Sequence, residues 1–210
     1  AFRASIRQRA GAGPGAALLV YAGRLSREKN VPLLVGMLEQ LMASGVDARL
    51  AVAGGGPLAP WLGRVAEERL GGRLLLLGHL ERRDDLARLL AGADAFVHPN
   101  EREPFGIGPL EAMAAGCPVV VPHTGGVRTY ASARNAWTAA PSPDAFAEQV
   151  RRLLADPHGR ETRRQAAFDT AAYFAWPRVT ARLFATYDDF VREWRGQPAP
   201  AIPSTAYPLS

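Results

Sequence analysis

The chain has 210 residues, of which 48% are hydrophobic and 21% are charged, so it is long enough for one domain or at most two and has the composition of a globular protein. The 25 lysines and arginines outnumber the 20 acidic residues and give a formal charge of +5, which suits an anionic ligand, a nucleic acid or an acidic membrane surface. A disulfide framework is excluded because Cys117 is the only cysteine, and no apolar run approaches the length needed to span a bilayer.

The first half of the chain alternates apolar runs with segments of helical periodicity. Residues 1–15 are rich in Arg, Ala and Gly and predict a linker or a loose leading helix. A continuous apolar run at 17–22 predicts a strand buried on both faces. Asn30 and Pro32 then mark the start of a helix that ends near Ser44. The following elements are a strand at 50–53, a helix at about 61–70, a strand at 74–77, a helix opened by Asp84 and Asp85, and a strand at 95–97.

The second half continues this alternation and closes with two long helical segments. A loop leads into a helix that begins near Pro109 and ends at Gly116. Ser142 as the cap and Pro143 as the first helical residue predict another helix start. The other elements are a strand at 119–121, a weak strand at 136–139, helices at about 159–173 and 177–194, and a Pro-rich tail at 195–210.

Strands that alternate with helices predict an α/β, Rossmann-like fold, with a parallel sheet and helices on both faces. Ligands of such sheets bind outside the carboxyl ends of the strands. The glycine turns that begin at Gly23, Gly54 and Gly78 each follow a predicted strand. We therefore expect these turns to gather at one edge of the sheet and to form the ligand site there.

The stretch from Asn100 to Gly126 carries the most specific pattern. Residues 103–120 read EPFGIGPLEAMAAGCPVV, and Thr124, Gly125 and Gly126 follow as a tight turn. A glycine loop that feeds a helix N-terminus presents free N–H groups and the positive end of the helix dipole to an anion. Glu103 precedes the helix and Glu111 lies in its expected first turn, so a carboxylate on each side would hold sugar or ribose hydroxyls.

This pattern resembles the signature of retaining glycosyltransferases of the GT-B fold (glycosyl transferases group 1), in which it lies in the C-terminal, nucleotide-sugar-binding domain. Glu103 and Glu111, eight positions apart, match the paired acids of that signature. The resemblance implies a Rossmann-like domain at 16–176, preceded by the segment 1–15, and a helix at 177–194 that crosses back to an N-terminal Rossmann-like domain. Because this chain carries the signature of the second domain alone, we expect it to be a C-terminal half with the apolar stripe of its last helix exposed.

The resemblance also implies the roles of individual residues. Arg24 and Lys29 would bind the donor diphosphate and stabilise the charge that develops on the leaving group. Glu103 would approach the donor sugar near the reacting carbon, and Glu111 would accept hydrogen bonds from the ribose. The remaining donor contacts are expected from Gly23, from the turn with Gly54 and Gly56, from His79 and Leu80 near the base, and from the backbone N–H groups of Phe105, Gly106 and Ile107.

No cofactor and no metal ion is expected beside the donor, a UDP- or GDP-linked sugar. The chain has no Asp-x-Asp triplet, the pairs 84–85 and 188–189 are adjacent acids in helices, and no His/Cys cluster has zinc spacing. Arg24, Lys29 and the helix N-terminus would therefore replace magnesium. The acceptor is expected to be a saccharide, a lipid or a small molecule. The whole protein is expected to be a cytoplasmic bacterial enzyme of carbohydrate or cell-envelope biosynthesis. Any peripheral contact with the membrane would be made by the N-terminal domain.

Two other functions stay open at this stage. A sugar-nucleotide epimerase of the same fold would act on the same ligands without an acceptor, but the paired acids argue against it. A non-enzymatic nucleotide-sugar-binding module remains compatible with a half-length chain. A nucleic-acid partner is not expected, because the arginines do not cluster with aromatic residues. His98 follows a strand and is a further candidate to line the cleft, whereas His123 and His158 are expected to be structural or exposed.

Overall fold

A six-stranded parallel sheet forms the centre of the molecule in the computed structural model, which describes residues 2–196 and their side chains from residue 6 onward. The strands are β1 (Ala17–Ala22), β2 (Ala48–Ala53), β3 (Leu74–Gly78), β4 (Ala95–Val97), β5 (Val119–Pro122) and β6 (Trp137–Ala139). They lie in the order β3-β2-β1-β4-β5-β6, and every neighbouring pair is parallel. The predicted α/β class and the parallel sheet are confirmed.

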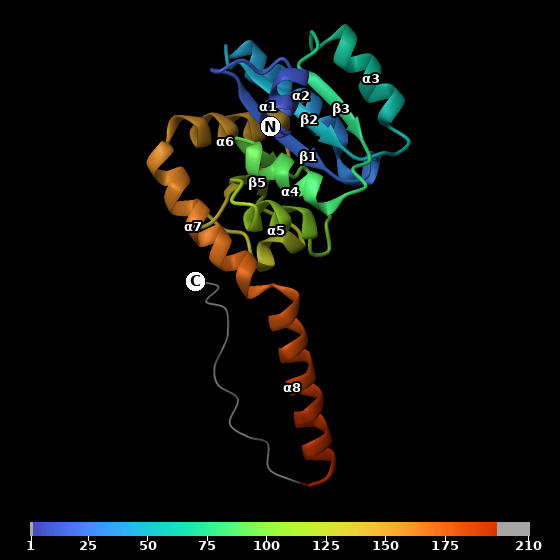
Figure 1. The fold of residues 1–210 in the computed structure, drawn as a ribbon, viewed down its shortest axis with the longest axis vertical. Coiled ribbons are helices and arrows are strands. Elements are labelled where there is room, and N and C mark those ends of the chain that lie inside the picture. Colours follow the sequence, from blue (N-terminus) through green and yellow to red (C-terminus); the bar gives the residue numbers. More distant parts are fainter. Residues whose placement is uncertain (1, 197–210) are drawn as a thin grey trace.

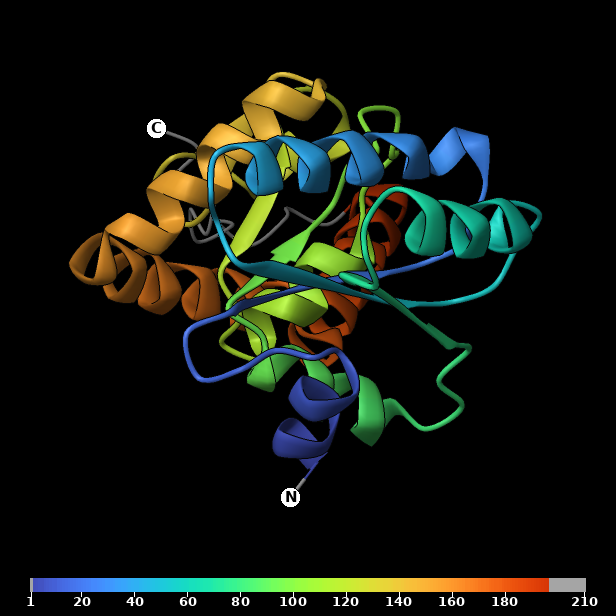
Figure 2. The ribbon, with the colours of Figure 1, turned by 90° about the horizontal axis from the view of Figure 1, so that it is seen from above.

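Helices cover both faces of this sheet (Figures 1 and 2). They are α1 (Phe2–Arg9), α2 (Val31–Ala43), α3 (Ala59–Glu68), α4 (Arg83–Gly92), α5 (Ile107–Ala114), α6 (Pro143–Ala155), α7 (Pro157–Tyr173) and α8 (Trp176–Trp194), with short 3-10 turns η1 (Arg27–Lys29) and η2 (Gly126–Thr129). Helices α2, α3 and α6 pack on one face, and α1, α4, α5 and α7 pack on the other. Two apolar cores result, one on each side of the sheet.

The central strand β1 shows why the sheet is buried on both faces. Leu19 and Tyr21 point into the core under α2, α3 and α6, whereas Leu18 and Val20 point into the core under α1, α4 and α5. All four side chains are buried. A strand covered on both faces needs apolar residues at every position, so the unbroken run at 17–22 identifies it correctly.

Residues 2–15 are a packed part of the domain. Of the two alternatives, the leading helix is confirmed as α1, but it is not loose, because Ile6, Ala10 and Ala12 are buried in the second core. The Arg7 guanidinium pairs with Asp94 at 3.0 Å, and the same carboxylate accepts a hydrogen bond from the N–H of Leu18. This ion pair fastens α1 to the loop before β4.

The order of the strands determines where along the sheet a ligand can bind. The chain moves outward from β1 to β2 and β3 and then returns to the other side of β1 with β4. The loops that leave β1 and β4 therefore diverge, which opens a crevice at the carboxyl ends of the strands. The turns after the first four strands, which begin at Gly23, Gly54, His79 and His98, meet at this edge as predicted.

Helix α8 extends away from the rest of the molecule (Figure 1). None of its residues is buried. The expected exposure of its apolar stripe is confirmed, because Leu183, Tyr187, Phe190 and Trp194 are between 48% and 86% exposed. No helix in the described part of the chain is both long and apolar enough to cross a membrane. The tail predicted at 195–210 lies outside the described residues from 197 onward.

Candidate functional site

A cleft of about 540 Å³ lies at the carboxyl ends of the first four strands. Loops after β1, β2, β3 and β4 form its walls, together with the start of α5. The residues that line it are Tyr21, Ala22, Gly23, Arg24, Lys29, Ala53, Gly54, Gly55, His79, Leu80, Leu86, His98, Glu103, Gly106, Ile107, Gly108 and Glu111. The fold thus brings together residues that are as far as 90 positions apart in sequence, from Tyr21 to Glu111.

All of the predicted site residues except Gly56 and Phe105 line this cleft. Gly56 instead packs against the loop after β1, where an added Cβ would lie 2.5 Å from the carbonyl oxygen of Leu25. The ring of Phe105 packs edge to face against Tyr130 and Phe174. The Phe105 ring therefore anchors the loop from behind, and Gly56 has a packing role between two loops.

The turn after β2 comes very close to the turn after β1. A Cβ on Gly54 would lie 2.0 Å from the carbonyl oxygen of Gly23, and Gly54 has φ 134°, which other residues rarely adopt. The Tyr21 hydroxyl donates to the carbonyl of Arg24 at 3.0 Å and holds the first turn in place. This packing keeps the backbone of both turns at the wall of the cleft.

Helix α5 points its N-terminus into the cleft. Gly106, with φ 86°, precedes the helix, and its carbonyl accepts a hydrogen bond from the Tyr130 hydroxyl. The helix begins at Ile107, two residues earlier than predicted, so Gly108 lies inside it and Glu111 falls in its second turn. The unpaired N–H groups of the first turn and the dipole make this end attractive to an anion.

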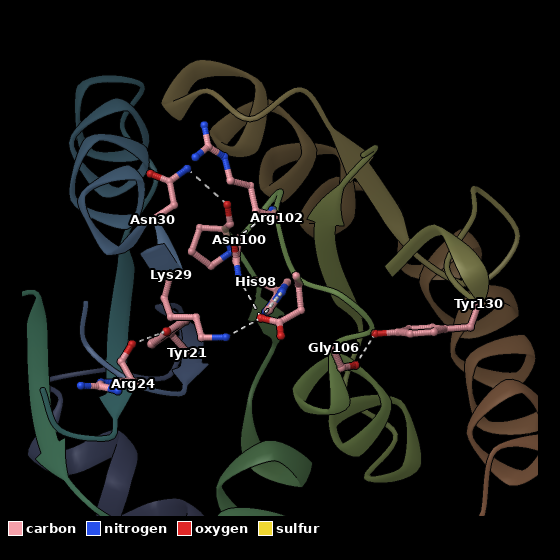
Figure 3. Close-up of polar contacts among 11 residues, drawn as sticks. Tyr21, Arg24, Lys29, Asn30, His98, Asn100, Arg102, Gly106 and Tyr130 are labelled. Atoms are coloured by element: carbon pink, nitrogen blue, oxygen red, sulfur yellow. Dashed lines mark hydrogen bonds and ion pairs between the residues drawn. The ribbon is translucent and has the colours of Figure 1, made fainter. Parts of the chain in front are cut away.

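Glu103 is held by two donors from different parts of the chain. Lys29 Nζ lies 2.7 Å from Glu103 Oε2, and Asn100 Nδ2 donates to the same oxygen at 2.8 Å. Burial by itself would raise the pKa of this carboxyl, but the hydrogen bonds from Lys29 and Asn100 and the charge of Lys29 outweigh it and lower the pKa. Figure 3 shows Lys29 and Asn100 approaching from the β1 and β4 sides of the cleft. Glu103 is therefore a fixed carboxylate.

His98 lies next to this carboxylate, at the end of β4. Its side chain is 8% exposed, and its Nε2 is 3.9 Å from Glu103 Oε2. Burial lowers the pKa of His98 to about 4, with the Glu103 charge opposing this and the Lys29 charge adding to it. The imidazole is consequently neutral at neutral pH. The candidate position of His98 at the cleft is confirmed.

Arg24 and Glu111 are the more exposed charges of the cleft. Within the described range 2–196, Arg24 forms no ion pair, so its guanidinium is available to an anionic ligand. Burial raises the pKa of Glu111, against the opposing charge of Arg83. Among residues 2–196, no group of three His, Cys, Asp or Glu side chains is arranged to hold a metal ion.

The turn at Thr124–Gly126 supports the Glu103 loop from behind. The N–H of Gly126 donates to the carbonyl of Glu103 at 2.8 Å. A Cβ on Gly126 would lie 1.8 Å from the carbonyl oxygen of Pro104, and one on Gly125 would lie 2.2 Å from that of Glu101. The predicted tight turn therefore also docks against the backbone of the loop that carries Glu103.

Three residues have roles at the site that the sequence did not predict. Asn30 occupies the N-cap position of α2 as expected, but its backbone is left-handed (φ 53°) and its side chain donates to the carbonyl of Pro99 at 3.3 Å rather than capping the helix. Asn100 and Tyr130 hold Glu103 and Gly106, respectively. Asn100 opens the central motif and was within reach of sequence reasoning. Tyr130 carries no sequence signal, because its partner lies 24 residues away.

At the carboxyl ends of the parallel strands, the cleft combines an exposed arginine, a helix N-terminus and two carboxylates, an arrangement whose chemistry suits a phosphorylated, hydroxyl-rich ligand. The sequence profile described as "Glycosyl transferases group 1" matches residues 2–170. This chain belongs to that family, and its fold is the Rossmann-like α/β fold of GT-B glycosyltransferases.

Two relatives from Mycobacterium tuberculosis illustrate the similarity. A GDP-mannose-dependent alpha-(1-6)-phosphatidylinositol dimannoside mannosyltransferase is 38% identical over 175 residues, which are 83% of this chain and 45% of that protein. A glycogen synthase is 34% identical over 201 residues, which are 93% of this chain and 48% of that protein. The chain thus spans slightly less than half the length of each relative.

Solved structures show the same fold. Sucrose-phosphate synthase from Thermosynechococcus elongatus superposes with a TM-score of 0.75 and 25% identity, over 90% of this chain and 49% of that one. Anabaena Alr3699/HepE in complex with UDP-glucose superposes with a TM-score of 0.69 and 23% identity, over 81% of this chain and 48% of that one.

Proposed function

We propose that this chain is the donor-binding half of a retaining glycosyltransferase, which transfers a sugar from a nucleoside-diphosphate sugar to a saccharide, lipid or small-molecule acceptor. The observation that carries the proposal is the composition of the cleft: Arg24 without an ion pair among the described residues, the free N-terminus of α5, and Glu103 and Glu111 around one space of about 540 Å³. Cations and N–H groups suit a diphosphate, and carboxylates suit sugar hydroxyls.

The proposed chemistry needs charge stabilisation more than acid–base catalysis. The bond between the anomeric carbon and the diphosphate oxygen breaks, the acceptor oxygen bonds to that carbon on the same face, and the acceptor proton passes to the leaving phosphate. Negative charge grows on the diphosphate during this step. Arg24, Lys29 and the α5 N-terminus would stabilise it without a metal ion.

The remainder of the active site would come from an N-terminal domain. The chain spans slightly less than half of its relatives, and the aromatic face of α8 lies exposed. An N-terminal Rossmann-like domain packed on α8 would cover this face and supply the acceptor site. We therefore expect the isolated chain to bind the donor weakly and to turn over little, and we place the whole enzyme in the cytoplasm, with membrane contact confined to the N-terminal domain.

Calorimetric titration of this chain tests the proposal. GDP and GDP-mannose are titrated first, since the 38% identical relative is named for that donor, followed by UDP, UDP-glucose and ADP. We expect one nucleotide class to bind, and Arg24→Met to weaken it about 10- to 100-fold through the loss of a charge-assisted hydrogen bond. Arg27→Met is the matched control, because Arg27 is exposed in the same loop but does not line the cleft.

The outcomes separate the alternatives. Binding that EDTA abolishes and magnesium restores would overturn the metal-independent site. Conversion of the donor sugar to its epimer without acceptor would favour the epimerase. Absence of nucleotide binding in both this chain and its full-length parent would refute the donor site itself.

A further inference from the structure

Lys29 and Glu103 neutralise each other in the cleft, although the proposed function needs them for different parts of a ligand. Their side chains are 30% and 16% exposed, and Nζ lies 2.7 Å from Oε2. Asn100 donates to the same oxygen. An anion that competes for Lys29 would therefore remove one of the two donors that now hold Glu103.

His98 is placed to replace that donor. The backbone N–H of His98 donates to the carbonyl of Val120 at 2.9 Å, so the backbone of His98 continues the line of β4. Its Nε2 is buried and has no hydrogen-bond partner in the described part of the chain. Glu103 Oε2 is 3.9 Å away, which is beyond hydrogen-bond distance but within reach of a small side-chain movement. Buried polar atoms almost always have partners, so this unpaired nitrogen calls for an explanation.

The charges around His98 favour a neutral donor in this position. Burial keeps its pKa near 4, and the charged groups that face it are the Glu103 carboxylate and the Lys29 ammonium. A neutral imidazole carries one N–H and does not repel Lys29. The carboxylate accepts hydrogen bonds only, so a contact with Glu103 requires the tautomer with the proton on Nε2.

We propose that His98 is a positioning residue, which takes over from Lys29 as the second hydrogen-bond donor to Glu103 when an anion draws Lys29 away. The inference rests on the proposed function in that the anion would be the diphosphate of a sugar donor. Glu103 then has two hydrogen-bond donors in each state. They are Lys29 and Asn100 without the anion, and His98 and Asn100 when the anion is bound. Its carboxylate stays oriented while Lys29 becomes free for the ligand.

The exchange is testable without any ligand. Lys29→Met removes the ammonium, as a competing anion would, and Lys29→Arg is the control that retains the charge. In ¹⁵N NMR of the imidazole, we expect His98 in Lys29→Met to adopt the Nε2–H tautomer, with its proton shifted strongly downfield. An imidazole spectrum identical in wild type and Lys29→Met, or a proton on Nδ1 in Lys29→Met, would overturn the proposal.

The pKa of Glu103, followed by ¹³C NMR of its carboxyl group, supplies a second readout. His98→Leu should leave this pKa nearly unchanged while Lys29 is present, but should raise it by about one unit more in the Lys29→Met background, because only there does the imidazole donate. His98→Gln, which keeps an N–H donor, should restore most of this difference. Equal effects of His98→Leu in both backgrounds would refute the exchange. These results do not depend on nucleotide binding, so absence of nucleotide binding in both this chain and its full-length parent would refute the proposed function and not this inference.

Discussion

Gly126→Ala tests whether the turn behind the Glu103 loop holds that loop in position. The new methyl carbon would lie 1.8 Å from the carbonyl oxygen of Pro104 and 2.7 Å from that of Glu103. Both neighbours are backbone atoms, so one of the two turns must move by about 1.2 Å to reach the 3.0 Å below which real Cβ contacts essentially never occur. Gly126 has no positive φ, so the alanine backbone itself is not strained.

The magnitude follows from two contributions. Overpacking costs about 1–3 kcal/mol, and loss of the hydrogen bond from the Gly126 N–H to Glu103 costs about 1 kcal/mol. We expect the free energy of unfolding to fall by about 2–4 kcal/mol, and Tm to fall by roughly 4–16 °C for a chain of this size. The displaced carboxylate should also lose Lys29, so the pKa of Glu103 should rise toward its ordinary value of 4.5.

Urea unfolding followed by circular dichroism, together with ¹³C NMR of Glu103, measures both effects. Gly13→Ala is the control, because Gly13 has no atom within 4 Å of an added Cβ and no positive φ. If Gly126→Ala matched the control in stability and kept the low pKa of Glu103, the turn would not position the loop.

Three further predictions concern groups outside this turn. The pKa of His98 is about 4 in the folded chain and 6.5 ordinarily, so the unfolded chain binds the proton more tightly. The neutral His98 therefore contributes about 3 kcal/mol to the free energy of unfolding. This contribution is complete above pH 6.5 and is lost as the pH falls toward 4. Urea unfolding from pH 4.5 to 7.5 should show this slope in wild type but a shallower one in His98→Gln. Phe184 lies in α8 with its ring 65% exposed, so Phe184→Ser should change the free energy of unfolding by less than about 0.5 kcal/mol. Phe146 is buried in the core, so in the same urea assay Phe146→Ala should lower the free energy of unfolding by about 3–5 kcal/mol. Burial raises the pKa of the Cys117 thiol, so a disulfide reagent at pH 8 should label it slowly in the folded protein and quickly in urea, and rapid labelling of the folded protein would contradict its buried position.

The elements could be predicted from sequence because their signals are local. Apolar runs identify strands covered on both faces, and Ser142 with Pro143 starts α6, where the Ser142 hydroxyl accepts a hydrogen bond from the N–H of Ala145 as expected. In glycine-rich segments, a helix can begin before the first residue that favours it. The α5 helix begins before Pro109 because Gly106, not the proline, makes the turn into it.

The loops that line the cleft could also be predicted from sequence, because parallel strands bring their carboxyl ends to one edge of the sheet. Loops that follow strands must then meet there, wherever they occur in the chain. The strand–helix alternation predicted that the turns after the strands gather at one edge, and the family resemblance assigned Arg24, His79 and Glu103 to the site there. The resemblance also assigned Gly56 to the site, but Gly56 packs against Leu25 and does not line the cleft.

The sequence by itself determined the class of fold, the edge at which the ligand site lies and the residues that supply its charge, because periodicity, turns and the central motif are properties of short stretches. The tertiary structure alone decided which of these residues contact one another. Lys29 meets Glu103 across 74 positions, and Tyr130 reaches Gly106 across 24. Such pairs depend on the strand order and on the packing of loops against each other to within about an ångström, and no local pattern encodes those distances.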